Sequence, residues 1–294
     1  MIENTRNSQA PDGSWGVHAE NSTVAERPDP LAYQCRLPLS STTLDMVANL
    51  VRSHLKKIGS RWRKLSPGRI ALIVLAVLRH DQRLADMADA YQVSASTVRR
   101  WLLEVIHLLA TRAERLDRAL NKLARRGGAV VLIDGMLIPT RRRTGADNRP
   151  NYSGKRKMHG LHVLALTDEK GNLIWVSAAR RGRTHDVTAA RHDHITAHLR
   201  AAGLGAIADL GFLGLDDDPD NPVIITGYRA ARGRRLSAAQ KEANKLVARE
   251  RAANEHAFGD LKNWRVLTKL RLGARHATAL LRALLVLTRT EVSR

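Results

Sequence analysis

The chain has 294 residues, 44% of them hydrophobic and 26% charged, a balance that excludes a disordered protein and allows one large core beside a smaller folded unit. Its 49 Lys and Arg residues outnumber the 28 acidic ones, and the net charge of +21 favours a polyanionic partner. The single Cys35 excludes an internal disulfide, and no apolar run reaches the ~18 residues of a membrane span, so we expect a cytoplasmic protein without a membrane partner.

The excess of positive charge belongs to the later part of the chain. Residues 1–60 hold six basic and six acidic side chains, so the whole excess lies from residue 61 onward. Arginine supplies most of it, and a planar guanidinium group matches the geometry of phosphate. A GC-rich genome also enriches arginine, so the charge alone leaves both explanations open.

The amino-terminal part predicts an arm followed by helices. Residues 1–41 are rich in Pro and Gly and show little hydrophobic periodicity, which predicts a flexible arm. Apolar residues at helical spacing then predict helices over 42–57 and 67–79. The predicted N-cap residues are Thr42 or Thr43 for the first helix and Ser66 for the second.

A short helix over 83–91, a tight turn at 92–93 and a helix beginning at Ser94 follow. This succession is typical of a helix-turn-helix, whose second helix enters the major groove of DNA, although a plain three-helix bundle has the same pattern. The basic, hydroxyl-rich start of the last helix favours DNA binding. We therefore predict a helix-turn-helix DNA-binding domain over 42–110 and a connecting helix over 111–128. The residues expected to contact DNA are Ser94, Ser96, Thr97, Arg99 and Arg100.

From residue 129 the pattern changes to an alternation of apolar strands and helices, which predicts an α/β domain over 129–294. The expected strands are 129–134, 161–166, 172–177, 205–209 and 222–226, and the expected helices are 186–199, 237–264 and 277–291. The second and third strands flank a Gly-containing turn and predict a hairpin. The first and fourth are almost wholly apolar, as strands buried on both faces are, and each ends in an aspartate.

These two aspartates, Asp134 and Asp209, and Glu255 on the long helix are the candidate catalytic residues. Mg²⁺ prefers oxygen ligands, and two such ions ~4 Å apart activate the attacking and leaving oxygens of a phosphate. Each acid also has a simpler explanation. Asp134-Gly135 and Asp209-Leu210-Gly211 have the composition of turns. Glu255 shares a helix face with Arg251 and Lys262, so an exposed ion pair would also explain it. Spacing alone leaves these alternatives open.

Short sequence motifs around the three acids favour a catalytic role for them. They are Tyr-Ser-Gly-Lys at 152–155, His-Gly at 159–160, His-Asp at 185–186, and Arg251, Glu255 and Lys262 on one helix. In this order they resemble the DDE transposases of bacterial insertion sequences, nearest the branch that shares its endonuclease domain with Harbinger-type elements. The resemblance covers roughly residues 60–292.

The resemblance implies a ribonuclease-H-like catalytic core, a mixed sheet flanked by helices, preceded by an all-α helix-turn-helix domain. It implies that Asp134, Asp209 and Glu255 form a catalytic and metal-binding triad for two Mg²⁺ or Mn²⁺ ions. The implied protein is a bacterial, nucleoid-associated transposase. It binds the terminal inverted repeats of an insertion sequence, cleaves double-stranded DNA, joins the ends to target DNA, and assembles as a homo-oligomer on that DNA.

Other polar residues complete the predicted site. A basic stretch next to the site is expected to follow a DNA backbone, although charge runs are often solvated loops: Arg141, Arg142, Arg143, Lys155, Arg156 and Lys157. Supporting roles beside the acids are expected for His159, His185, Asp186, Arg251 and Lys262. A zinc site among the histidines, including His162, is less favoured because no Cys lies near and no H-E-x-x-H spacing occurs.

Two alternatives to a transposase remain at this stage. A domesticated or inactive copy would keep the DNA-binding surface without catalysis, although the presence of all three acids speaks against it. A metal-dependent endonuclease would cut DNA without strand transfer, and its carboxylate site would be the same.

Overall fold

The structure is a computed structural model that describes residues 36–60, 63–141, 146–216, 218–233, 235–268, 270 and 273–292, apart from the side chains of 146, 147 and 253–255. Most of the predicted arm over 1–41 therefore lies outside the described residues. Residues Leu37–Arg294 form one compact unit. No helix in the described part is long and apolar enough to cross a membrane.

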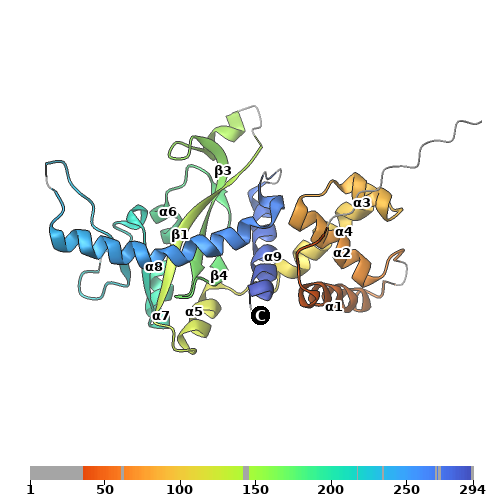
Figure 1. The fold of residues 1–294 in the computed structure, drawn as a ribbon, viewed down its shortest axis with the longest axis horizontal. Coiled ribbons are helices and arrows are strands. Elements are labelled where there is room, and N and C mark those ends of the chain that lie inside the picture. The colour runs from red at the N-terminus through yellow and green to blue at the C-terminus, as the bar shows by residue number, and fades with distance from the viewer. Residues whose placement is uncertain are drawn as a thin grey trace, which may run out of the picture. The chain divides into compact units, whose positions relative to one another are not determined.

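The four predicted amino-terminal helices are confirmed (Figure 1). They are α1 (Ser41–Lys57), α2 (Pro67–His80), α3 (Leu84–Ala90) and α4 (Ala95–Ala110). Ser66 caps α2 as predicted, but α1 is capped by Ser40 and not by a threonine. The Ser40 hydroxyl also donates to Glu291 at 2.7 Å, a contact across 251 residues that fixes where α1 begins.

The connection between α3 and α4 is the tight turn that the sequence predicts. Gln92 has a φ of +50°, and the amide of Val93 donates to the carbonyl of Ala88. Ser94 caps α4, and Val98 and Trp101 on the inner face are buried. The outer face of the first turns of α4 is exposed. The role of this unit in DNA binding remains a prediction.

A mixed sheet forms the centre of the second half, as predicted (Figure 1). Its strands are β1 (Val130–Pro139), β2 (Tyr152–Ser153), β3 (Met158–Thr167), β4 (Leu173–Val176), β5 (Arg180–Arg181), β6 (Gly205–Ala208) and β7 (Ile224–Thr226). The order is β2-β3-β1-β6-β7, with β4 and β5 also paired to β3. Strand β1 runs antiparallel to β3 and parallel to β6.

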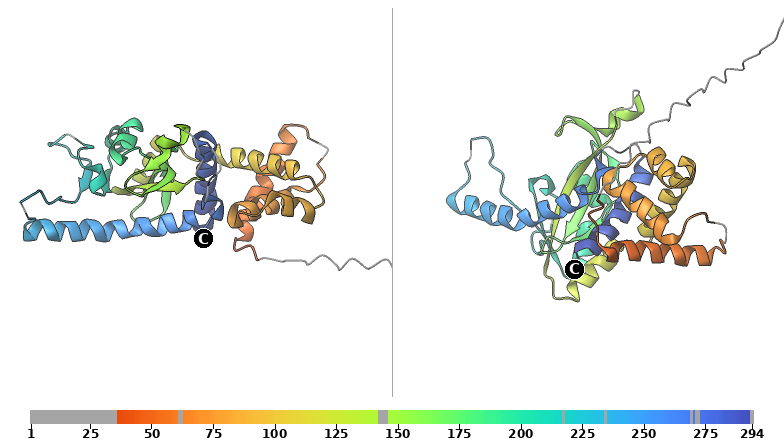
Figure 2. Two further views of the ribbon diagram at one scale, coloured as in Figure 1. Left: turned by 90° about the horizontal axis from the view of Figure 1, so that it is seen from above. Right: turned by 45° about the vertical axis from the view of Figure 1, so that its right-hand side comes forward.

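Helices cover both faces of this sheet. On one face α5 (Leu116–Ala124), α6 (Asp186–His192) and α7 (Ile195–Ala202) pack on apolar residues of β1, β3 and β6. On the other face α8 (Ala238–Lys262) and α9 (Ala274–Val292) share one apolar cluster with α1, α2 and α4. Figure 2 shows α8 on the side of the sheet opposite α6 and α7. Because the cluster is continuous, α9 joins the amino-terminal helices to the sheet.

Two predicted boundaries are wrong. Strand β1 does not end at Asp134 but continues to Pro139, because its second half stays paired with β3 up to Gly160. The helix predicted over 186–199 is two helices, and His194 between them has a φ of +52°. The remaining predicted elements occur with shifted ends.

Candidate active site

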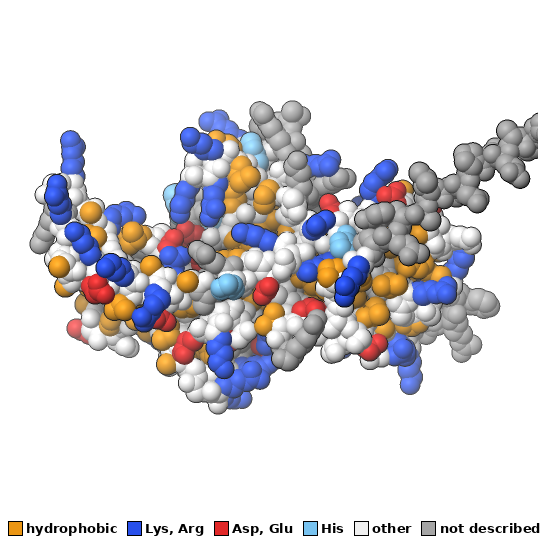
Figure 3. Space-filling model, in the orientation of Figure 1, with side chains coloured by type: hydrophobic (Ala, Val, Ile, Leu, Met, Phe, Trp, Pro, Cys, Tyr) orange, Lys and Arg blue, Asp and Glu red, His pale blue; other side chains and the backbone are white. Residues whose placement is uncertain are grey.

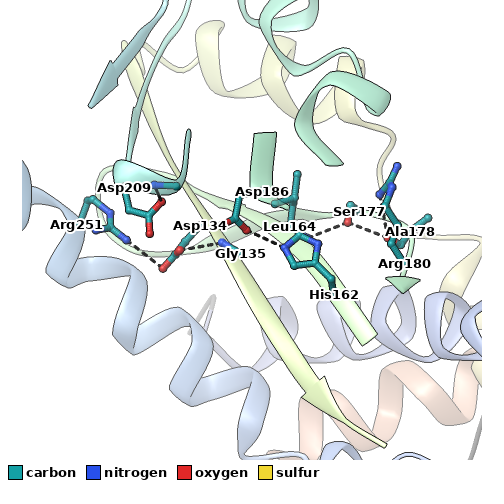
Figure 4. Close-up of polar contacts among 11 residues, drawn as sticks. Asp134, Gly135, His162, Leu164, Ser177, Ala178, Arg180, Asp186, Asp209 and Arg251 are labelled. Atoms are coloured by element: carbon teal, nitrogen blue, oxygen red, sulfur yellow. Dashed lines mark hydrogen bonds and ion pairs between the residues drawn. The ribbon is translucent and has the colours of Figure 1, made fainter. Parts of the chain in front are cut away.

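Asp134, in β1, and Asp209, directly after the neighbouring strand β6, lie side by side (Figure 4). In the parallel pairing of β1 with β6, Ile133 is opposite Ala208, and the next residue along each chain segment is one of the two aspartates. Their side chains project from the same face of the sheet because residues at equal register in paired strands share a face. The structure thus brings these two candidate acids together, Asp134 from within β1 and Asp209 from directly after β6.

Each aspartate is oriented by the amide of a nearby glycine. The Gly135 amide donates to Oδ1 of Asp134 at 2.8 Å, and the Gly211 amide donates to Oδ1 of Asp209 at 2.8 Å. The second bond also caps the short 3₁₀ helix Leu210–Phe212, whose Phe212 is buried below it. One carboxylate oxygen of each acid is thus held by the backbone.

The second oxygen of Asp134 faces α8. Oδ2 lies 3.3 Å from Nη2 of Arg251, and about a quarter of each side chain is exposed. Burial raises the pKa of Asp134 above its ordinary value, and the charges of Asp209 and Asp186 add to this rise. Arg251 and the Gly135 amide act in the opposite direction. A further positive charge placed beside the Asp134 carboxylate would therefore stabilise its ionised form.

The third candidate acid, Glu255, belongs to α8, but its side chain lies outside the described residues. Helix α8 begins at a capping box formed by Ser237 and Gln240 and packs on β1 and β6. Position 255 follows Arg251 by four residues, about one helical turn. Among the side chains that are described, no three His, Cys, Asp or Glu residues form a group that could hold a metal ion.

Asp186 and His162 form a largely buried pair close to the aspartates. Nε2 of His162 lies 2.7 Å from Oδ1 of Asp186, and the two side chains are 8% and 19% exposed. The sequence predicted for His162 no role beyond a less favoured zinc site, and this contact was not predicted. The available signal was a single imidazole in the otherwise apolar run over 161–166.

The other predicted supporting residues are spread along the chain. The His159 ring packs edge-on against Tyr152, with centroids 5.1 Å apart. His185 occupies the N-cap position of α6 but makes no side-chain capping bond. Lys262 is exposed at the last residue of α8.

The predicted DNA-contacting residues that are described lie mostly on the surface. Arg141 is exposed after β1, and Lys155, Arg156 and Lys157 are exposed in the turn between β2 and β3. Figure 3 shows Lys and Arg side chains gathered near this end of the sheet. Arg142 and Arg143 lie outside the described residues. On α4, Ser94, Ser96, Arg99 and Arg100 are exposed, while Thr97 is half-buried and donates its amide to Ser94 Oγ at 3.2 Å.

The raised pKa of Asp134 predicts a cost in stability. An acid whose pKa rises on folding holds its proton more tightly in the folded state, so stability falls as pH rises from the ordinary value of 3.8 through the raised one. We expect Asp134→Asn to stabilise the metal-free chain at neutral pH, on the order of 1 kcal/mol. The gain should shrink at acidic pH, where Asp134 is neutral anyway. Thermal melting in a chelator at several pH values measures this, and a lower melting temperature at neutral pH would contradict it.

The residues that carry the two aspartates match a known protein family. Residues 133–289 match the family model described as "DDE superfamily endonuclease". The chain is 27% identical over 211 residues to the "Putative transposase for insertion sequence element IS112" of Streptomyces albus G, an alignment that covers 70% of this chain and 74% of that protein. No solved structure matches this chain.

Proposed function

We propose that this chain, which belongs to the DDE superfamily endonuclease family, is a transposase that cuts DNA at the ends of an insertion sequence and joins those ends to target DNA. One observation carries the proposal. Asp134 and Asp209, which both fall within the matched residues, each directly follow the last residue pair, Ile133 and Ala208, of the parallel pairing between β1 and β6. The similarity to a protein named as a transposase over 70% of the chain favours joining as well as cutting.

In this proposal Asp134, Asp209 and Glu255 are the catalytic, metal-binding residues for Mg²⁺ or Mn²⁺. The donor set fits such ions, because carboxylate oxygens are the ligands that hard divalent cations prefer. When bound, two such ions activate the attacking oxygen and stabilise the leaving oxygen of an in-line displacement at phosphorus. The glycine amides orient one oxygen of each aspartate in advance, which lowers the cost of ordering the site on binding.

Arg251 has two roles in the proposal. Without an ion it neutralises Asp134 through the 3.3 Å contact, and with DNA bound it supplies a guanidinium group to the scissile phosphate. Lys262, at the last residue of the same helix, supplies a second positive charge near the DNA. His159 and His185 support the edge of the site.

The proposed substrate is double-stranded DNA in two forms. The exposed start of α4 binds the terminal inverted repeats, and the basic residues at 141–143 and 155–157 follow the backbone of end or target DNA. Both ends of an element have to be cut and joined together, so we expect a homo-oligomer on the DNA. The cytoplasmic nucleoid of a bacterium is the expected location.

A joining assay separates this proposal from its alternatives. Purified chain and Mn²⁺ are incubated with a plasmid target and with one end of the element, supplied either within flanking DNA, which reports cutting, or as a pre-cut fragment, which reports joining. A covalently joined product that disappears with Glu255→Gln supports a transposase. Cutting without joining, with end binding verified, would favour an endonuclease. Binding with neither product would favour an inactive DNA-binding protein.

A further inference from the structure

The His162–Asp186 pair lies on the sheet face opposite to the carboxylate of Asp134. Side chains alternate along a strand, so Asp134 and Gly135 point to opposite faces. Asp134 points toward α8, where it meets Arg251, and Gly135 points toward α6, which begins at Asp186. Figure 4 shows Gly135 between Asp134 on one side and the Asp186–His162 pair on the other.

Two glycines leave room for the Asp186 carboxylate. A Cβ atom added to Gly135 would lie 1.9 Å from Oδ1 of Asp186 and 3.0 Å from Nε2 of His162. A Cβ atom added to Gly211 would lie 2.7 Å from Oδ2 of the same carboxylate. The carboxylate thus fills the space between two glycines. These are the glycines whose amides hold the two candidate catalytic aspartates.

The pairing with His162 fixes this carboxylate. His162 is buried on β3, and its Nδ1 has no hydrogen-bond partner among the described residues. A buried lone pair without a partner costs less than a buried N–H without one, which favours the tautomer with the proton on Nε2. Nε2–H then donates to Oδ1 of Asp186 at 2.7 Å. His162 on β3 thus holds the Asp186 carboxylate from one side, and Gly135 and Gly211 pack against its other side.

We propose that His162 and Asp186 are positioning residues that set the separation of Asp134 and Asp209 by packing between Gly135 and Gly211. The inference rests on the proposed function, because it assigns the pair to the spacing of metal-binding acids. Asp186 acts here through its shape and its hydrogen bond and is not itself a metal ligand. Partners of this kind typically change metal affinity ~10- to 100-fold when they are removed.

The test measures Mn²⁺ binding by the full chain in calorimetric titrations, together with the Mn²⁺ concentration that gives half-maximal cleavage. Asp186→Ala is expected to weaken Mn²⁺ binding ~10- to 100-fold. Asp186→Asn keeps the shape and can still accept from Nε2–H, so it should bind Mn²⁺ nearly as the parent does. Asp193→Ala is the matched control, because it breaks a 2.7 Å ion pair with Arg180 at the other end of α6.

A double substitution tests the packing itself. Gly135→Ala alone should weaken Mn²⁺ binding because its methyl group displaces Asp186. Added to Asp186→Ala it should cause little further loss, since the clash is gone. Should melting curves show that Asp186→Ala does not fold, Gly135→Ala and Asp186→Asn alone test the packing, since only Gly135→Ala displaces the carboxylate and should lose Mn²⁺ affinity.

The outcomes separate this inference from the function on which it rests. Parental Mn²⁺ affinity in Asp186→Ala, or equal losses in Asp186→Ala and Asp186→Asn, would overturn the positioning role while leaving the proposed function intact. Absence of Mn²⁺ binding by the parent chain would overturn both. Loss in Asp186→Ala with retention in Asp186→Asn and Asp193→Ala supports the inference.

Discussion

Substitution of Asp209 or Asp134 by Asn is expected to lower metal-dependent cleavage of end DNA by roughly 10³-fold or more, since carboxylate-held ions supply several kcal/mol to such reactions. Asparagine keeps the size of the side chain and an oxygen that can accept from the glycine amide, so the fold and the end affinity should persist. What is lost is one negative charge at the place where a divalent cation would bind.

The measurement is single-turnover cleavage of end DNA in Mn²⁺, with a gel-shift assay for end binding. Asp168→Asn is a suitable control, because Asp168 also accepts from backbone amides, at 2.8 Å from Asn172, but in the β3–β4 turn. Cleavage at the parental rate by Asp209→Asn would refute the assignment. The expected combination for Asp134→Asn is a chain that is more stable at neutral pH and inactive.

The two aspartates could be found from the sequence because each follows an apolar run that folds as a buried strand. The end of the first strand could not be predicted in the same way. Asp134-Gly135 has the local composition of a turn, yet the strand continues because β3 pairs with its second half. Pairing with β3 therefore outweighs the local turn signal. Gly135 is needed in the strand because a side chain there would collide with Asp186.

Contacts between distant residues account for the other differences. The N-cap of α1 involves Glu291, and the break between α6 and α7 lies beside the ion pair of Asp193 with Arg180. His162 and Asp186 are 24 residues apart, and only the pairing of strands shows that they meet. Periodicity finds helices and strands, whereas partners across the sheet depend on topology.

Replacement of both Arg99 and Arg100 by Ala is expected to weaken binding to the element's ends roughly 10- to 100-fold, because one bidentate base contact is worth ~1–3 kcal/mol. Both side chains are exposed near the start of α4. The substitution should leave the helix intact. Ser94 still caps it, Val98 and Trp101 remain buried, and Ala is the best helix-forming residue.

The matched control is Arg112→Ala, which removes one charge from an exposed position just beyond the opposite end of α4. Fluorescence anisotropy with end DNA and with unrelated DNA, at several salt concentrations, measures the effect. A larger loss on end DNA indicates contacts to bases, because these carry sequence information. An equal loss on both DNAs with a shallower salt dependence indicates phosphate contacts. If the double substitution binds end DNA as tightly as Arg112→Ala does, the start of α4 is not the DNA-reading surface, and the short turn between α3 and α4 belongs to a helical bundle with a structural role only.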